Sequence, residues 1–121
     1  MLNLLKRPIW LVAFAMIFSV ALEARDYYGA ISYSPSTGKY GYSYDYNYRS
    51  GAESAARNQC ARRDCSTLLW FRNACGSLAV GRNGYGSGWG SNRARAKREA
   101  LKSCRRYTGG CRVVNTICTT R

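Results

Sequence analysis

"YGYSYDYNYRSGAESAARNQC", residues 40–60, has a counterpart later in the chain, "YGSGWGSNRARAKREALKSC", residues 85–104. Each copy begins with aromatic residues that alternate with small ones, a period of two that is typical of a strand. Each then continues with alanines at helical spacing and ends in a cysteine. The two copies are about 45 residues apart. Such self-similarity predicts one supersecondary unit used twice, each copy covering the apolar face of the other.

Each unit is predicted to run strand, strand, helix, strand, with unit one over residues 27–72 and unit two over residues 75–119. The strands are expected at 27–34, 39–46, 66–72, 75–80, 85–89 and 112–119, and the helices at 50–60 and 92–107. The predicted fold class is therefore α+β: two ββαβ pseudo-repeats whose antiparallel strands pack on two helices.

Turn and cap residues separate these elements. In "SPSTGK", residues 34–39, a proline early in the turn and a glycine free to take positive φ predict a hairpin. Asn83–Gly84 is a two-residue hairpin signal. Ser50 and Glu53 have the spacing of a capping box, and Asn92 is expected to cap the second helix.

The six cysteines indicate disulfides, because an even count in a short exported chain is typical of a disulfide framework. Six cysteines allow fifteen connectivities. The repeat favours one of them. Cys60–Cys65 and Cys104–Cys111 occupy matching places in the two units, which leaves Cys75 and Cys118 to pair with each other.

The N-terminus predicts export. Lys6 and Arg7 precede an apolar run, "IWLVAFAMIF", residues 9–18. This run is too short to span a bilayer, which takes roughly 20 apolar residues. We predict a secretory signal peptide over residues 1–24, with an uncleaved anchor as the alternative.

Cleavage is expected after Ala21 or Ala24, where small residues are available. A mature chain of residues 25–121 would be a single small domain in the periplasm or outside the cell, with no transmembrane segment. It would carry 17 Lys and Arg against 5 Asp and Glu, a net charge of +12.

The aromatic residues divide into two predicted groups. Tyr40 and Tyr44 match Tyr85 and Trp89 of the second unit, and we expect them in the core, against the alanine-lined helices. Three further rings, Tyr42, Tyr46 and Tyr48, are the candidate surface aromatics. The alternate glycines from Gly84 to Gly90 predict a smooth strand face for close approach of a backbone or ring, in preference to a phosphate loop.

Four segments resemble an exported bacterial family known as domain of unknown function 4189 (DUF4189). They are "YGAISYSPSTGKYGYSYD", "LLWFRNACGSLAVG", "GYGSGWG" and the late "CRVV…C", and together they cover essentially the whole predicted mature chain. The resemblance implies export, a compact doubled fold and intact disulfides. It implies no particular reaction, and relatives include proteins regarded as secreted virulence factors or envelope proteins.

Catalytic chemistry has few candidates in this sequence. The absence of histidine excludes triads and general bases built on that residue. A glycosidase needs two positioned carboxylates, for which Asp45 with Asp64 is the formal possibility. We predict no catalytic residues, no metal site and no cofactor, and an enzyme remains the least favoured class.

The basic residues are the main functional signal. Five of them share one arc of the second helix, opposite its alanines. These candidate anion-binding residues are Arg95, Arg98, Lys102, Arg105 and Arg106. We predict a non-enzymatic binding module for an unknown protein or a polyanionic envelope component, with an inhibitor or immunity protein as a subtype. Nucleic acid would also satisfy the charge, without specificity. The alternative is a secreted effector or membrane-active protein. The oligomeric state is left open.

Overall fold

The computed structural model describes residues 25–121, so the predicted signal peptide lies outside the described residues. The elements follow the order predicted from the repeat. In chain order they are β1 (Tyr28–Tyr33), β2 (Tyr40–Tyr46), α2 (Arg49–Cys60), β3 (Ser66–Arg72), β4 (Cys75–Val80), β5 (Tyr85–Gly90), α3 (Arg93–Arg105) and β6 (Arg112–Cys118). Within the described range, no helix is long and apolar enough to cross a membrane.

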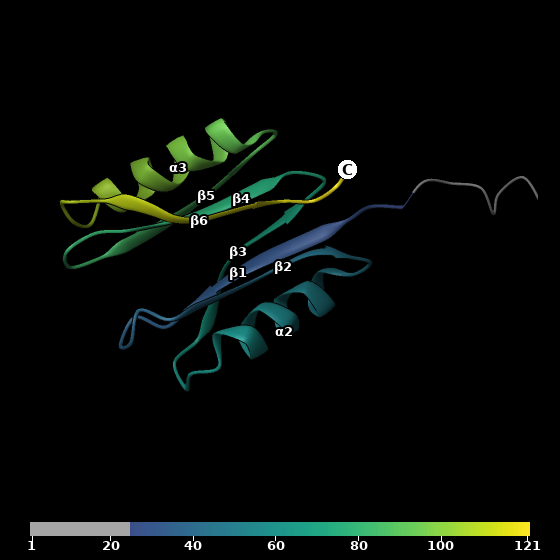
Figure 1. Cartoon of the computed structure of the whole chain (residues 1–121), viewed down its shortest axis with the longest axis horizontal. Coiled ribbons are helices and arrows are strands. Elements are labelled where there is room, and N and C mark those ends of the chain that lie inside the picture. The colour runs from purple at the N-terminus through teal and green to yellow at the C-terminus, as the bar shows by residue number, and fades with distance from the viewer. Residues whose placement is uncertain (1–24) are drawn as a thin grey trace, which may run out of the picture.

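Each unit forms its own antiparallel sheet of three strands, in the order β2-β1-β3 for the first and β5-β4-β6 for the second. The sheets stack face to face, and each carries its helix on the outside (Figure 1). The molecule is therefore a four-layer sandwich, helix–sheet–sheet–helix, which confirms the predicted α+β class.

The helices lie almost directly on the strand backbone. A Cβ added to Gly41 of β2 would overlap the carbonyl oxygen of Ala56 in α2, and one added to Gly86 of β5 would overlap the backbone nitrogen of Cys104 in α3. Ala52 and Ala56 on α2 are fully buried. The close approach predicted from alternating glycines is thus confirmed, and the approaching group is a helix backbone.

The main core lies between the two sheets and contains the large side chains. Ile31, Phe71 and Leu78 form its centre, and the half-buried Tyr40 and Tyr42 pack against it. The prediction for Tyr44 is wrong, because its side chain is 50% exposed.

The prediction that the large aromatic residues of β2 face its helix is wrong. Small residues cover the helix side of β2, and tyrosines cover the inter-sheet side. A helix backbone in contact with a strand leaves no space for a ring, whereas two facing sheets lie about 10 Å apart and need large side chains between them. Tyr42 is consequently a core residue, and of the three candidate surface aromatics only Tyr46 and Tyr48 are exposed.

The predicted capping box is wrong. The helix begins at Arg49, and its N-cap, Tyr48, makes no side-chain cap. Glu53 forms an ion pair with Arg49 at 3.0 Å, because a helix that begins before Ser50 places these two charges one turn apart. Asn92 caps α3 as predicted, its Oδ1 accepting from the backbone nitrogen of Arg95 at 2.9 Å.

Both predicted hairpins form, with one difference in turn chemistry. Gly38 takes a positive φ of 76°, as expected. In the second hairpin, the nitrogen of Gly81 donates to the oxygen of Gly84, and neither Asn83 nor Gly84 has a positive φ. The turn therefore centres on Arg82 and Asn83, and the Asn-Gly signal does not act through a left-handed backbone.

The structure confirms the three disulfides that the repeat favours. Cys60–Cys65 and Cys104–Cys111 each join a helix end to the segment that follows it. Cys75–Cys118 joins β4 to β6, where the two residues are register partners.

Candidate functional site

The sandwich has two lateral ends, each made of one strand edge from each sheet. At one end β2 lies over β6, and at the other β5 lies over β3. All four are edge strands, so each carries a row of backbone groups that its own sheet leaves unpaired. The two ends are equivalent in the repeat, and they differ in how these groups are satisfied.

The hairpin bonds show which backbone groups point outward. Antiparallel pairs alternate between hydrogen-bonded and non-hydrogen-bonded residues. The bond from Gly81 to Gly84 continues along β4–β5 as bonded positions at Gly86 and Gly88. The backbone N–H and C=O groups of Tyr85, Ser87 and Trp89 therefore face away from the sheet.

The same alternation on β2 places the backbone groups of Tyr40 and Tyr42 outward, because Ser34 donates to Lys39 at the hairpin. Here the edge is closed by a side chain. The Oε1 atom of Gln59, on α2, accepts a hydrogen bond from the nitrogen of Tyr42 at 2.6 Å.

The neighbouring β6 edge is also closed. The Tyr40 hydroxyl donates to the carbonyl oxygen of Val114 at 3.3 Å. The guanidinium of Arg93 donates to the carbonyl oxygen of Thr116 at 2.8 Å. The β2/β6 end thus has side chains on three backbone groups that another strand would use: the nitrogen of Tyr42 and the carbonyl oxygens of Val114 and Thr116.

The β5/β3 end is open and hollowed. A groove of about 390 Å³ runs from the edge of β5 to α3; its lining residues are Leu69, Ser87, Gly88, Trp89, Arg95, Glu99, Lys102, Ser103 and Arg106. We call it the β5 groove. Two further hollows continue it along the strand edges, one past Tyr85 and Tyr107 and one past Trp70 and Arg72. Among residues 25–121, no side chain bonds the outward backbone groups of Tyr85, Ser87 or Trp89.

Three of the five predicted anion-binding residues line the β5 groove: Arg95, Lys102 and Arg106. Arg98 and Arg105 lie on the same helix and do not line it. Throughout the described chain, the only ion pairs are Arg49–Glu53 and Arg72–Asp26. The groove cations are therefore available to an external anion.

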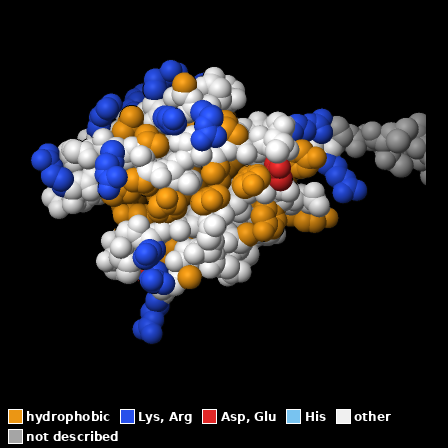
Figure 2. All heavy atoms as spheres, viewed as in Figure 1, with side chains coloured by type: hydrophobic (Ala, Val, Ile, Leu, Met, Phe, Trp, Pro, Cys, Tyr) orange, Lys and Arg blue, Asp and Glu red, His pale blue; other side chains and the backbone are white. Residues whose placement is uncertain are grey.

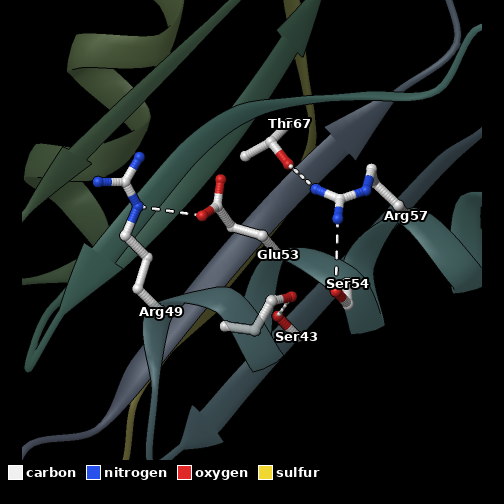
Figure 3. Close-up of polar contacts among 7 residues, drawn as sticks. Ser43, Arg49, Glu53, Ser54, Arg57 and Thr67 are labelled. Atoms are coloured by element: carbon white, nitrogen blue, oxygen red, sulfur yellow. Dashed lines mark hydrogen bonds and ion pairs between the residues drawn. The ribbon is translucent and has the colours of Figure 1, made fainter.

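The cations of α2 are held within the protein. Arg49 pairs with Glu53, and its guanidinium carbon also lies 4.3 Å from the centre of the Trp70 ring. Arg57 donates to the hydroxyls of Thr67 and Ser54 (Figure 3). The two basic residues of α2 thus contact β3, whereas Arg95, Lys102 and Arg106 of the β5 groove form no ion pair within residues 25–121.

Two exposed aromatic residues on this side of the sandwich escaped prediction: Trp89 lines the β5 groove, and Tyr107 lines the hollow that continues it. Trp89 is 59% exposed and Tyr107 is 71% exposed. The prediction that Trp89 lies in the core with Tyr44 is wrong, because both rings are half exposed or more. Figure 2 shows hydrophobic side chains in a band along the junction of the sheets, with Lys and Arg above it over α3.

The carboxylates proposed as a formal catalytic pair are not brought together. Asp64 accepts hydrogen bonds from the hydroxyl of Ser34 at 2.5 Å and the nitrogen of Ser36 at 3.0 Å, before β2 begins. These bonds lower the pKa of Asp64 from 3.8 to about 2. Asp45 lies at the other end of β2 and accepts from the nitrogen of Thr120. Each carboxylate thus has a separate local partner.

Comparison with known proteins identifies a family and similar individual proteins. The model of the family described as "Domain of unknown function (DUF4189)" matches residues 28–118. The chain is 42% identical over 79 residues to Protein Rv1269c of Mycobacterium tuberculosis and to Protein Mb1300c of Mycobacterium bovis. That match covers 65% of this chain and 62% of the length of each relative.

A solved structure is also similar, the NMR structure of Rv1813c from Mycobacterium tuberculosis. It has 31% sequence identity and a TM-score of 0.59, covering 76% of this chain and 74% of that chain. The fold is therefore shared with this protein.

Proposed function

Since the chain belongs to the DUF4189 family, we propose a function from the groove itself: the protein is a non-enzymatic binding module that holds an anionic partner in the β5 groove. The observation that carries this proposal is the set of unpaired cations, Arg95, Lys102 and Arg106, beside the exposed ring of Trp89. A protein partner or a polyanionic envelope component would satisfy the same chemistry, and an inhibitor is one form that such a module takes.

The electrostatics support an anionic partner. The whole sequence has 19 Lys and Arg against 6 Asp and Glu. A surface of one sign attracts its partner over about 10 Å at 0.1 M salt and raises the association rate. The groove concentrates part of this charge next to an apolar surface, which gives a bound partner both ionic and apolar contacts.

The disulfides support the same assignment. Three disulfides in a small domain are typical of proteins that fold in an oxidising compartment. The predicted signal peptide is consistent with this, so the proposed location is the periplasm or the outside of the cell. Anionic polymers and proteins of the cell envelope would be the accessible partners.

A membrane-active protein is the weaker alternative. Membrane insertion of a surface helix requires a free apolar face. The apolar residues of α3 include Ala96 and Ala100, both fully buried against the sheet, and α2 is packed in the same way. Leakage of anionic lipid vesicles at low micromolar protein would favour this alternative over the groove.

Heparin chromatography tests the proposal. The variant Arg95→Gln/Lys102→Gln/Arg106→Gln is expected to elute at markedly lower salt than the wild-type protein, because three cations leave one site. The control Arg62→Gln/Arg63→Gln/Arg112→Gln removes equal charge elsewhere and is expected to elute near wild type. Equal shifts in both variants, or wild-type elution below about 0.15 M salt, would reject a dedicated anion site.

A further inference from the structure

We propose that the partner is an extended acidic peptide segment that binds as an added strand on the free edge of β5, beneath α3. This inference rests on the proposed function and specifies the partner of the same groove. It follows from three features: unpaired backbone groups, a different chemistry on the two faces of the edge, and an asymmetry between the equivalent edges of the two units.

The backbone groups define the binding mode. Tyr85, Ser87 and Trp89 direct their N–H and C=O groups outward, with no side-chain partner within residues 25–121. An edge of this length accepts an extended peptide through main-chain hydrogen bonds, while alternate side-chain pockets give specificity. Most edge strands in native proteins are blocked, so an open one at a hollow is a binding surface.

The two faces of the added strand would meet different chemistry. On the helix side of β5, where Gly86 and Gly88 lie under α3, the groove presents Arg95, Lys102 and Arg106. On the inter-sheet side it presents the exposed Trp89 and the half-buried Leu69. Because successive side chains of a strand point to opposite faces, the matching peptide alternates acidic and apolar residues.

The equivalent edge of unit one shows what a closed edge requires. Gly41 lies under the nitrogen of Cys60, and Gly86 lies under the nitrogen of Cys104, so the two helices sit on their strands in the same register. The residue before the cysteine is Gln59 in α2 and Ser103 in α3. Gln59 bonds the outward nitrogen of Tyr42, whereas Ser103 lines the β5 groove beside Ser87.

A second copy of this chain does not suit the edge. Pairing two β5 edges would bring the groove cations of both copies together, and each copy carries a strong net positive charge. The outward positions of β5 hold no carboxylate, and Glu99 is the one acidic residue of the groove lining. Like charges across an interface disfavour association, so an acidic peptide is the complementary occupant.

The test uses the mature, disulfide-bonded protein and a short synthetic peptide in which Glu alternates with Val. Binding is measured by titration calorimetry, and amide hydrogen exchange reports on β5. We expect protection of the amides of Tyr85, Ser87 and Trp89 when the peptide binds. The same peptide with N-methylated amides keeps its charge and is expected to bind at least tenfold more weakly, because each lost hydrogen bond weakens binding several-fold.

Two variants separate the contribution of strand addition to peptide binding from the contribution of charge. Ser103→Gln places the side chain that bonds β2 onto β5, and it is expected to weaken peptide binding about tenfold while lowering the salt of heparin elution far less than the triple cation variant does. Ser87→Pro removes the outward donor and no ladder bond, with the same expected result. The control Gln59→Ser leaves peptide affinity unchanged. A Glu99→Gln variant is expected to bind the peptide more tightly, since it removes a repelling carboxylate.

The outcomes distinguish the two proposals. Peptide binding that falls with the groove cations and is insensitive to Ser103→Gln, Ser87→Pro and N-methylation would overturn strand addition and keep the anion site. If the triple cation variant and its control elute from heparin at the same salt, the proposed function itself would be overturned. If the wild-type protein is a dimer and Ser103→Gln dissociates it, the occupant of the β5 edge is a second copy of this chain and not a peptide.

Discussion

The same chemical change, glycine to alanine, is expected to have opposite effects at two positions of unit one. At Gly41 the new methyl group would overlap the carbonyl oxygen of Ala56 and lie 2.5 Å from the nitrogen of Cys60. Both obstacles are backbone atoms of α2, so the helix itself must move off the sheet. At Gly51, within α2, the nearest atom is a ring carbon of the exposed Tyr46 at 3.3 Å, which can move aside.

The expected magnitudes follow from these contacts. Overpacking a well-packed core costs about 1–3 kcal/mol, and Gly41→Ala is expected at or above the upper end, because a whole helix must shift. Gly51→Ala is expected to raise the free energy of unfolding by about 0.5–1 kcal/mol, the difference in helix propensity. For a domain of this size, 1 kcal/mol changes the Tm by about 4–8 °C.

Guanidinium unfolding of the mature protein with its disulfides intact measures both variants. Wild-type protein and the corresponding Gly86→Ala variant of unit two serve as references, and Gly86→Ala is expected to resemble Gly41→Ala. A free energy of unfolding for Gly41→Ala within 0.5 kcal/mol of wild type would refute the direct contact of α2 with β2.

Three further outcomes are expected. Leu78→Ala, at the centre of the inter-sheet core, should destabilise the protein by about 2–5 kcal/mol in the same unfolding assay, and a smaller effect would contradict its complete burial. The pKa of Asp64 is lowered from 3.8 to about 2, so its stabilising contribution is present above pH 3.8 and is lost as the pH falls toward 2; Asp64→Asn should flatten the Tm profile over that interval. Replacing Cys75 and Cys118 together with Ser opens the longest disulfide loop, with a sequence separation of 43 residues, and should cost about 4 kcal/mol by chain entropy.

The repeat allowed most of the architecture to be predicted, because two copies of one unit constrain each other. Matching Cys60 with Cys104 placed both helices at the same point in the order of their units and left one pairing for Cys75 and Cys118. The order of all eight elements followed from the same alignment.

The assignment of faces could not be predicted in the same way. Alternation along residues 40–46 identifies two faces of a strand, and it does not state what covers each one. Tyr44 was placed under the helix because alanines on α2 suggested space for a ring, but that space is absent when the helix backbone lies on Gly41. Predicting this close contact would have required the distance of α2 from the sheet, which depends on tertiary packing.

The β5 groove was predictable in part. The helical spacing of Arg95, Lys102 and Arg106 was visible in the sequence, and these three residues meet at one surface. The open edge beside them was not visible, because the direction of a backbone N–H depends on strand register. The hairpin bond of Gly81 to Gly84, which the structure supplies, shows that the backbone N–H and C=O groups of Ser87 point away from the sheet.

Opening the closed edge of unit one separates the two requirements of the proposed site. Gln59→Ser frees the outward nitrogen of Tyr42. The helix α2 lacks two of the groove cations of α3, because Gly51 and Asn58 stand where Arg95 and Lys102 stand in the second unit. We therefore expect Gln59→Ser to keep a stoichiometry of one acidic peptide per chain in titration calorimetry. The double variant Gln59→Ser/Ala55→Arg adds a cation above the freed edge and is expected to bind a second, weaker peptide. A second peptide bound by Gln59→Ser alone would show that a free edge is sufficient and that the cations of α3 do not select the partner.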